Sequence, residues 1–130
     1  MVMRIIWTIL AIFIAWTILD FFLHEFFLRS VYESTPNLWR PMSQMSAALI
    51  GLVRAVLILC FTLIYALLIK EKSFASGIQF GALFGLAIGV SVGFGTYIHT
   101  PMPLTLAWGW FLGGWIKAIA AGAIAGALVK

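Results

Sequence analysis

The sequence predicts an all-α integral membrane protein, a four-helix bundle with up-down-up-down helices and both termini on the same side. Two observations lead to this fold class. The chain of 130 residues is 64% hydrophobic and only 9% charged, whereas an ordinary soluble domain is about 45–50% apolar and about 25% charged. Because so few charged side chains cannot cover a compact globule of this size, lipid has to surround most of it. The second observation is that the apolar residues fall into four long runs.

Each of these runs is long enough to cross a hydrocarbon layer, which requires about 20 residues of helix. We predict a single transmembrane domain with helices over residues 5–28, 45–69, 78–98 and 104–129. The first run follows Arg4 as the apolar core of a signal peptide would, but such a core has only about 7–15 residues. We therefore expect the first run to be retained as a helix.

The connections between the runs are short and contain helix breakers. Pro36 and Pro41 interrupt the first connection, residues 70–77 form a polar turn, and Pro101 and Pro103 mark the last connection. Short connections make successive helices antiparallel neighbours, which predicts the alternating bundle.

Positive charges near the ends of the spans predict the orientation, because cytoplasmic loops carry an excess of Lys and Arg. Four of these charges fall on the side of the termini and two on the other side: Arg4, Lys70, Lys72 and Lys130 against Arg29 and Arg40. We therefore expect both termini in the cytoplasm and, for a bacterial chain, a location in the inner membrane.

Small residues recur every four positions in the last two helices. They are Gly81, Gly85, Gly89 and Gly93 in the third helix, and Ala118, Gly122 and Gly126 in the fourth. Such stripes let helix backbones approach closely in lipid. We expect the two helices to pack on each other or on a partner subunit, and the glycine stripe to support a homo-oligomer or a complex with other membrane subunits.

The composition also argues against several partners and sites. The net charge of +4 arises from scattered cations with no basic run, so we do not expect nucleic acid as a partner. Cys60 is the only cysteine, which rules out a disulfide within the chain, and we expect it to be a small buried side chain. No cofactor can be named from the sequence.

Ionisable residues inside the predicted spans give the best lead to function, because such residues are costly in a membrane and usually face a bundle interior or a wet cavity. The first helix contains Asp20, His24 and Glu25, the second Arg54, the fourth Lys117, and His99 lies near the outer end of the third. All six lie near the middle or in the outer half of the bundle, and Asp20 and Arg54 lie at similar depths.

Two interpretations of these charges remain open. In the first, Asp20 pairs with Arg54 or Lys117 to neutralise charge, and the chain is a structural or accessory subunit of a larger membrane complex. In the second, the same three residues form the charged floor of an outward-opening pocket with His24, Glu25 and His99 at its mouth. That pocket would bind or transport a small polar or anionic solute or relay protons, and it is our leading hypothesis.

Other sites are less well supported. His24 and His99 can be imagined as paired metal or haem ligands, but no dense ligand motif accompanies them. No serine or cysteine has a base at motif spacing, so an enzyme is not the favoured interpretation. Trp108 and Trp115 are candidates to line the pocket beside Lys117, where an indole face would attract the cation.

Two larger patterns complete the sequence. The segments Tyr32 to Pro36 and Tyr97 to Pro101 share Tyr-x-x-Thr-Pro, each after an outward-running helix, as a duplicated hairpin would produce. The aromatic-polar stretch from Trp16 to Trp39, the glycine-rich stretch from Gly81 to Gly95 and the small residues of the fourth helix resemble a group of uncharacterised small four-helix bacterial membrane proteins. This resemblance implies the four-helix fold and no activity or site.

Overall fold

The computed structural model describes all 130 residues, and helices are its only regular elements. The first long helix consists of α1 (Val2–Phe21) and a π-helical continuation η1 (Phe22–Phe27). The second is α3 (Ala47–Leu68) and the fourth is α6 (Leu104–Leu128). The third consists of α4 (Phe74–Val90), a π-helical segment η4 (Ser91–Gly95) and α5 (Thr96–His99). The predicted all-α four-helix bundle is confirmed.

Three short elements form the connection between the first two long helices. They are α2 (Arg29–Glu33), η2 (Pro36–Leu38) and η3 (Met42–Gln44). The prolines predicted to break this segment do so, because Pro36 begins η2 and Pro41 immediately precedes η3.

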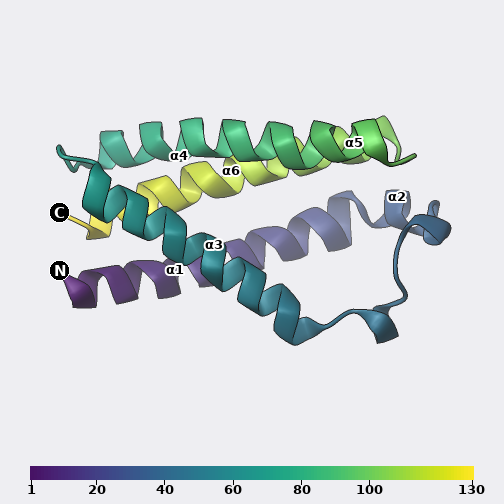
Figure 1. Cartoon of the computed structure of the whole chain (residues 1–130), viewed down its shortest axis with the longest axis horizontal. Coiled ribbons are helices and arrows are strands. Elements are labelled where there is room, and N and C mark those ends of the chain that lie inside the picture. Colours follow the sequence, from purple (N-terminus) through teal and green to yellow (C-terminus); the bar gives the residue numbers. More distant parts are fainter.

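The four long helices run lengthwise between two ends of the bundle, and both termini lie at the same end (Figure 1). We call this the termini end and the opposite one the loop end. At the termini end, Arg4 Nη1 donates a hydrogen bond to the carbonyl oxygen of Lys130 over 3.4 Å. Each long helix is long and apolar enough to cross a membrane. These lengths and compositions indicate a membrane-embedded protein.

Helix α4 packs on α6 along a stripe of buried glycines, and this is the most extensive contact in the bundle. The stripe consists of Gly77, Gly81, Gly85, Gly89 and Gly93. A Cβ atom at Gly81 would overlap the carbonyl group of Ala118, and one at Gly122 of α6 would overlap that of Gly77. The two backbones therefore touch directly, as dispersion-driven packing in lipid favours.

This contact resolves one alternative from the sequence. The glycine stripe packs on the fourth helix of its own chain, so it is covered and offers no surface to a partner. A second copy of the chain or another membrane subunit remains a prediction, but it would bind to a part of the molecule other than the glycine stripe.

Helix α3 packs most closely on the bundle in its half at the termini end. All of its buried residues lie in that half: Ile58, Phe61, Thr62, Tyr65 and Ala66. Phe61 contacts the rings of Phe80 and Phe84 on α4, at centroid distances of 4.7 and 5.0 Å. Nearer the loop end, α3 diverges from α4 (Figure 1), and residues 41–50 are all exposed. The outer half of α3 therefore has little helix packing.

The expectation for Cys60 was wrong. Its side chain is exposed on α3, whereas the neighbouring Phe61 is fully buried. Position 60 falls on the outward face of the helix because successive residues are rotated by about 100°. Apolar sequence surroundings in a membrane helix do not distinguish a lipid-facing position from a core position.

Candidate functional site

Three charged side chains from three helices meet inside the bundle. Asp20, near the end of α1, accepts a hydrogen bond from Arg54 of α3 and one from Lys117 of α6. The Oδ2–Nη2 distance to the arginine is 2.9 Å and the Oδ1–Nζ distance to the lysine is 2.7 Å. The Asp20 side chain is 13% exposed, and its partners are 22% and 21% exposed. We call these three residues the charge triad.

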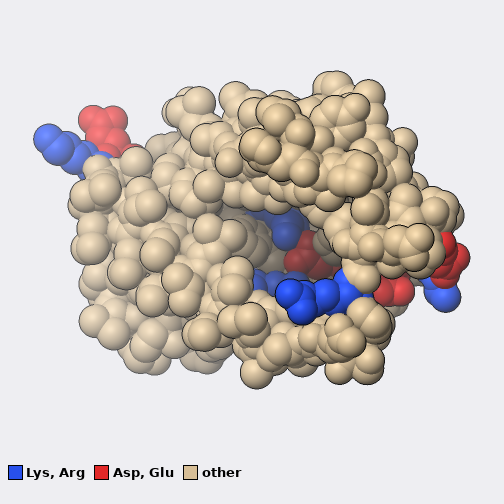
Figure 2. Space-filling view, turned by 45° about the vertical axis from the view of Figure 1, so that its right-hand side comes forward, with Lys and Arg blue, Asp and Glu red and all other residues tan.

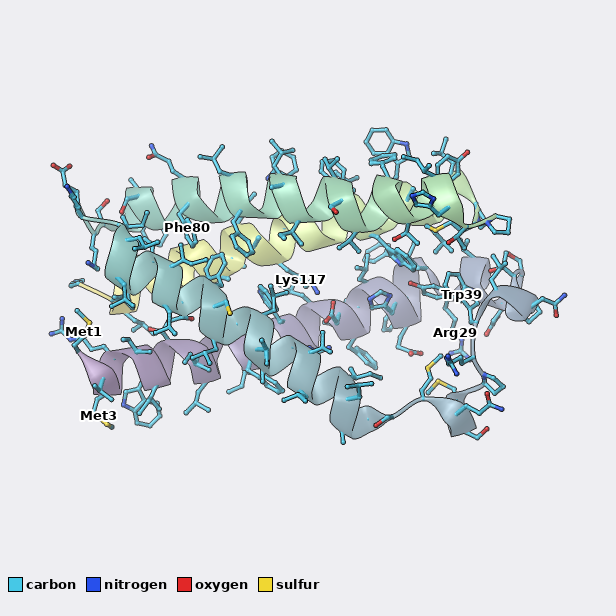
Figure 3. All side chains as sticks on the ribbon, in the orientation of Figure 1. Met1, Met3, Arg29, Trp39, Phe80 and Lys117 are labelled. Atoms are coloured by element: carbon cyan, nitrogen blue, oxygen red, sulfur yellow. The ribbon has the colours of Figure 1, made fainter.

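Neighbouring groups hold both cations of the triad in place. Arg54 also donates through Nη1 to the hydroxyl of Thr17, over 3.0 Å. The Lys117 ammonium lies 5.2 Å from the ring centroid of Trp16, a cation–π distance. The Trp16 indole in turn donates to the backbone carbonyl of Lys117, over 2.8 Å. Figure 3 shows Lys117 projecting from α6 into the space beside α1.

The aromatic partner of Lys117 differs from the one that the sequence suggested. Trp115 donates its indole N–H to the carbonyl of Ala82 on α4, and Trp108 packs edge-on against Phe94. Both rings belong to the contact between the third and fourth long helices. A helix places residues two apart on different faces, so Trp115 is turned away from the side on which Lys117 meets the charge triad.

A polar chain connects the triad to the loop end. Trp110 of α6 donates its indole N–H to the hydroxyl of Tyr32, over 2.6 Å, and that hydroxyl lies 2.7 Å from Nδ1 of His24. An indole only donates, so the Tyr32 hydroxyl accepts from Trp110, whereas the direction of its hydrogen bond with His24 depends on the tautomer of the imidazole. The remaining ring nitrogen, Nε2, lies 3.8 Å from Oδ1 of Asp20. The chain therefore runs Trp110, Tyr32, His24, Asp20.

The position of His24 depends on a local irregularity of the first helix. His24 lies within η1, a π-helical segment from Phe22 to Phe27. Such segments are rare in proteins overall. Where they occur they often belong to functional sites, because the wider turn changes which side chains face the interior. Here it accompanies the alignment of His24 with Asp20 on one side and Tyr32 on the other.

Burial raises the pKa of the Tyr32 hydroxyl above its ordinary value, although the hydrogen bond from Trp110 opposes this shift. We expect Tyr32 to titrate above the ordinary pKa of a tyrosine. Because the pKa of Tyr32 is higher in the folded than in the unfolded protein, the contribution of Tyr32 to folding stability is fully present below its unfolded-state pKa. That contribution is lost as the pH rises through its folded-state pKa. Ultraviolet absorbance titration of the wild type minus that of Tyr32→Phe measures this group alone. A difference curve centred at the ordinary tyrosine value would contradict this expectation.

Two hollows adjoin the triad. The first, which we call the cationic cleft, has a volume of about 730 Å³ and contains three cationic side chains, Arg40, Arg54 and Lys117. The second, which we call the apolar cavity, has a volume of about 350 Å³ and is lined mainly by Leu23, Leu57, Phe84, Ile88 and Val92, with His24 and Lys117 as its charged or titratable residues. Figure 2 shows basic and acidic atoms together at the bottom of a hollow in the surface.

The structure does not bring all six predicted site residues together. Asp20, His24, Arg54 and Lys117 meet. Glu25 and His99 are both exposed, and neither lines the cationic cleft or the apolar cavity. Glu25 is one residue from His24 and faces outward, as a rotation of about 100° per residue requires. His99 is the last residue of α5, at the loop end of the third long helix.

Sequence reasoning missed four residues that shape the site: Thr17, Tyr32, Arg40 and Trp110. Tyr32 had a signal, because it opens the Tyr-x-x-Thr-Pro repeat. In the structure Thr35 of that repeat accepts a hydrogen bond from Trp39, whose ring packs on both Tyr32 and Trp110 (5.5 and 5.7 Å between centroids). The motif therefore belongs to the aromatic wall of the site.

The carboxylate and imidazole side chains of the site do not cluster as the ligands of a metal ion do. No group of three or more His, Cys, Asp or Glu side chains converges in a geometry that can hold a metal. The carboxylate that comes nearest to an imidazole, Asp20, is already bound to two cations. Comparisons with known proteins add no further candidate, since no family model, curated protein or solved structure matches this chain.

Proposed function

We propose that this chain is an integral protein of the bacterial inner membrane, with both termini in the cytoplasm, that binds a small anionic solute in the cationic cleft. The observation that carries the proposal is the charge of the cleft. Three cations line it, and one carboxylate, Asp20, contacts two of them. Three positive charges less one negative charge leave an excess of two positive charges, which an anion would neutralise.

Arg40 supports this interpretation most directly. It is exposed, it lines the cleft, and it forms no hydrogen bond or ion pair within the chain. Guanidinium groups favour planar, bidentate binding of carboxylates and phosphates. Its position in the connection before α3 places a free anion-binding group at the loop end of the cleft, with the charge triad deeper inside.

The polar chain through His24 extends the charged site toward the loop end. His24 Nε2 lies 3.8 Å from Oδ1 of Asp20, and a protonated imidazole there would add a further positive charge beside that carboxylate. The titratable or charged groups that face Asp20 are therefore Arg54, Lys117 and His24.

The orientation rests on the distribution of positive charge. Arg4 and Lys130 lie together at the termini end, where the turn with Lys70 and Lys72 also lies, between α3 and α4. Following the positive-inside rule, this end faces the cytoplasm. The loop end, with the mouth of the cationic cleft, then faces outward.

A structural or accessory role is the second candidate, and one observation favours it. Asp20 binds two cationic side chains within 3 Å, as is expected of charges whose role is to neutralise one another inside the bundle. Extraction in a mild detergent separates the candidates. A self-contained monomer or homo-oligomer favours the binding protein, and co-purification with unrelated membrane chains in fixed proportion favours the accessory subunit.

Thermal unfolding in the presence of anions tests the proposed function. We expect inorganic phosphate to raise the Tm of the purified protein by a few degrees above chloride at equal ionic strength, because a ligand that binds only the folded state stabilises it. Arg40→Gln is expected to remove most of this increase. Arg40 forms no hydrogen bond or ion pair that this substitution would break, so the variant should fold normally.

Arg29→Gln is the matched control. Arg29 lies in the same connection but pairs with the exposed Glu33, away from the cleft. This variant loses the same charge and should keep the full response to phosphate. Equal responses of the wild type, Arg40→Gln and Arg29→Gln would show that any effect of phosphate is nonspecific, and the proposal would be wrong.

A further inference from the structure

The cationic cleft and the apolar cavity adjoin each other. They share three lining residues, Trp16, Leu57 and Lys117, which come from α1, α3 and α6. Lys117 is therefore a boundary residue, with its ammonium on Asp20 and its surroundings open to both hollows. A ligand large enough to fill one hollow would reach the edge of the other.

The two hollows differ in chemistry. The cationic cleft collects Arg40, Arg54 and Lys117, whereas the apolar cavity is walled largely by aliphatic and aromatic side chains of all four long helices. Their volumes of about 730 and 350 Å³ both fall in the range of ligand sites, about 300–1,000 Å³. A molecule complementary to both has an anionic group at one end and a hydrocarbon chain at the other.

We propose that the ligand is an anionic amphiphile, whose headgroup binds among the three cations and whose hydrocarbon chain occupies the apolar cavity. This inference rests on the proposed function and adds the chemical class of the ligand. The headgroup forms charge-assisted hydrogen bonds with Arg40 and Arg54, and the chain packs against the α4 side of the cavity, on Phe84, Ile88 and Val92.

The packing of α3 supplies the route for such a molecule. The half of α3 toward the loop end is exposed, with Leu49, Ile50 and Val53 among its exposed side chains, and Leu49, Ile50 and Val53 also line the cleft. In a bilayer this side of the cleft opens toward lipid, because no helix of the chain covers it. An amphiphile can then enter sideways from the membrane with its chain already solvated by lipid.

The test uses the full chain in phosphatidylcholine nanodiscs and three probes: dodecyl phosphate, inorganic phosphate and dodecanol. The readout is the apparent Kd from thermal unfolding midpoints. We expect dodecyl phosphate to bind the wild type at least about tenfold more tightly than inorganic phosphate does, and dodecanol to produce no specific shift.

Gly114→Leu is the decisive variant, because it fills the apolar cavity. Gly114 lines that cavity, and a Cβ atom there would meet only Gly89 Cα, at an ordinary contact of 3.9 Å. Gly51→Leu is the matched control, since Gly51 lines neither hollow and a Cβ atom there would meet nothing within 4 Å. Val92→Phe fills the same cavity from η4 and serves if Gly114→Leu does not fold.

The outcomes separate this inference from the function on which it rests. The amphiphile is supported if Gly114→Leu or Val92→Phe no longer binds dodecyl phosphate more tightly than inorganic phosphate. Binding of inorganic phosphate should then be unchanged in these variants, and Gly51→Leu should have no effect. If both phosphates bind equally and only Arg40→Gln weakens them, the cleft binds small anions and the amphiphile is overturned. If Arg40→Gln changes the binding of neither phosphate, the proposed function fails as well. If dodecanol binds as tightly as dodecyl phosphate, the assignment of the headgroup to the three cations is overturned.

Discussion

Replacing Asp20 by asparagine is expected to lower the free energy of unfolding by about 3–5 kcal/mol, the usual cost of removing one partner from a buried ion pair. The amide keeps the shape of the carboxylate but cannot neutralise Arg54 and Lys117, which are both largely buried. Two uncompensated cations then remain inside the bundle. Denaturation with a strong detergent, monitored by circular dichroism, measures the decrease in the free energy of unfolding.

Glu33→Gln provides the control for this substitution. Glu33 forms an ion pair with Arg29, also at 2.9 Å, but both side chains are 65% exposed. An exposed pair contributes little, because water and salt screen it. Equal effects of the two substitutions would mean that Asp20 is solvated as Glu33 is. The double variant Asp20→Asn with Arg54→Gln should recover part of the loss, since one unpaired cation remains instead of two.

Replacing Gly81 by leucine is expected to separate α4 from α6 and to lower the free energy of unfolding by about 3 kcal/mol, the top of the usual range for overpacking. The new side chain would have to occupy the place of the Ala118 carbonyl group on α6. Backbone atoms of a long helix cannot move aside as a flexible side chain does. The same denaturation experiment gives the free energy of unfolding.

Gly51→Leu again serves as the control, because a Cβ atom at Gly51 meets nothing within 4 Å. We expect its stability to equal that of the wild type or to exceed it slightly, as glycine is a poor helix former. A Gly81→Leu protein as stable as Gly51→Leu would mean that the glycine stripe does not pack on α6 in the membrane.

The positions of the helices were predictable because a bilayer imposes their length. The fourth helix begins at Leu104 as predicted, directly after Pro103. The largest error is at the third, which begins at Phe74 and not at residue 78. Ser73 and Ser76 form a capping box there, and this signal was overlooked because the segment was interpreted as a polar turn.

The charge triad was foreseeable from depth alone, because ionisable residues at similar depth in neighbouring helices have no better partners than each other. Which other side chains face the charge triad could not be predicted from the sequence. Depth does not fix the rotation of a helix about its axis, and the π-helical turn at His24 changes that rotation locally. For this reason Glu25 and His99 were included in the site, whereas Tyr32 and Trp110 were not.

The most direct test of a cationic cleft that accepts an anion is the stability of Asp20→Asn as phosphate is added. In this variant Arg54 and Lys117 have lost their carboxylate, and a bound phosphate can take its place between them. The account predicts that phosphate raises the Tm of Asp20→Asn more than that of the wild type and restores much of the lost stability. An increase no larger than that of the wild type would contradict it, because it would mean that anions do not reach the triad.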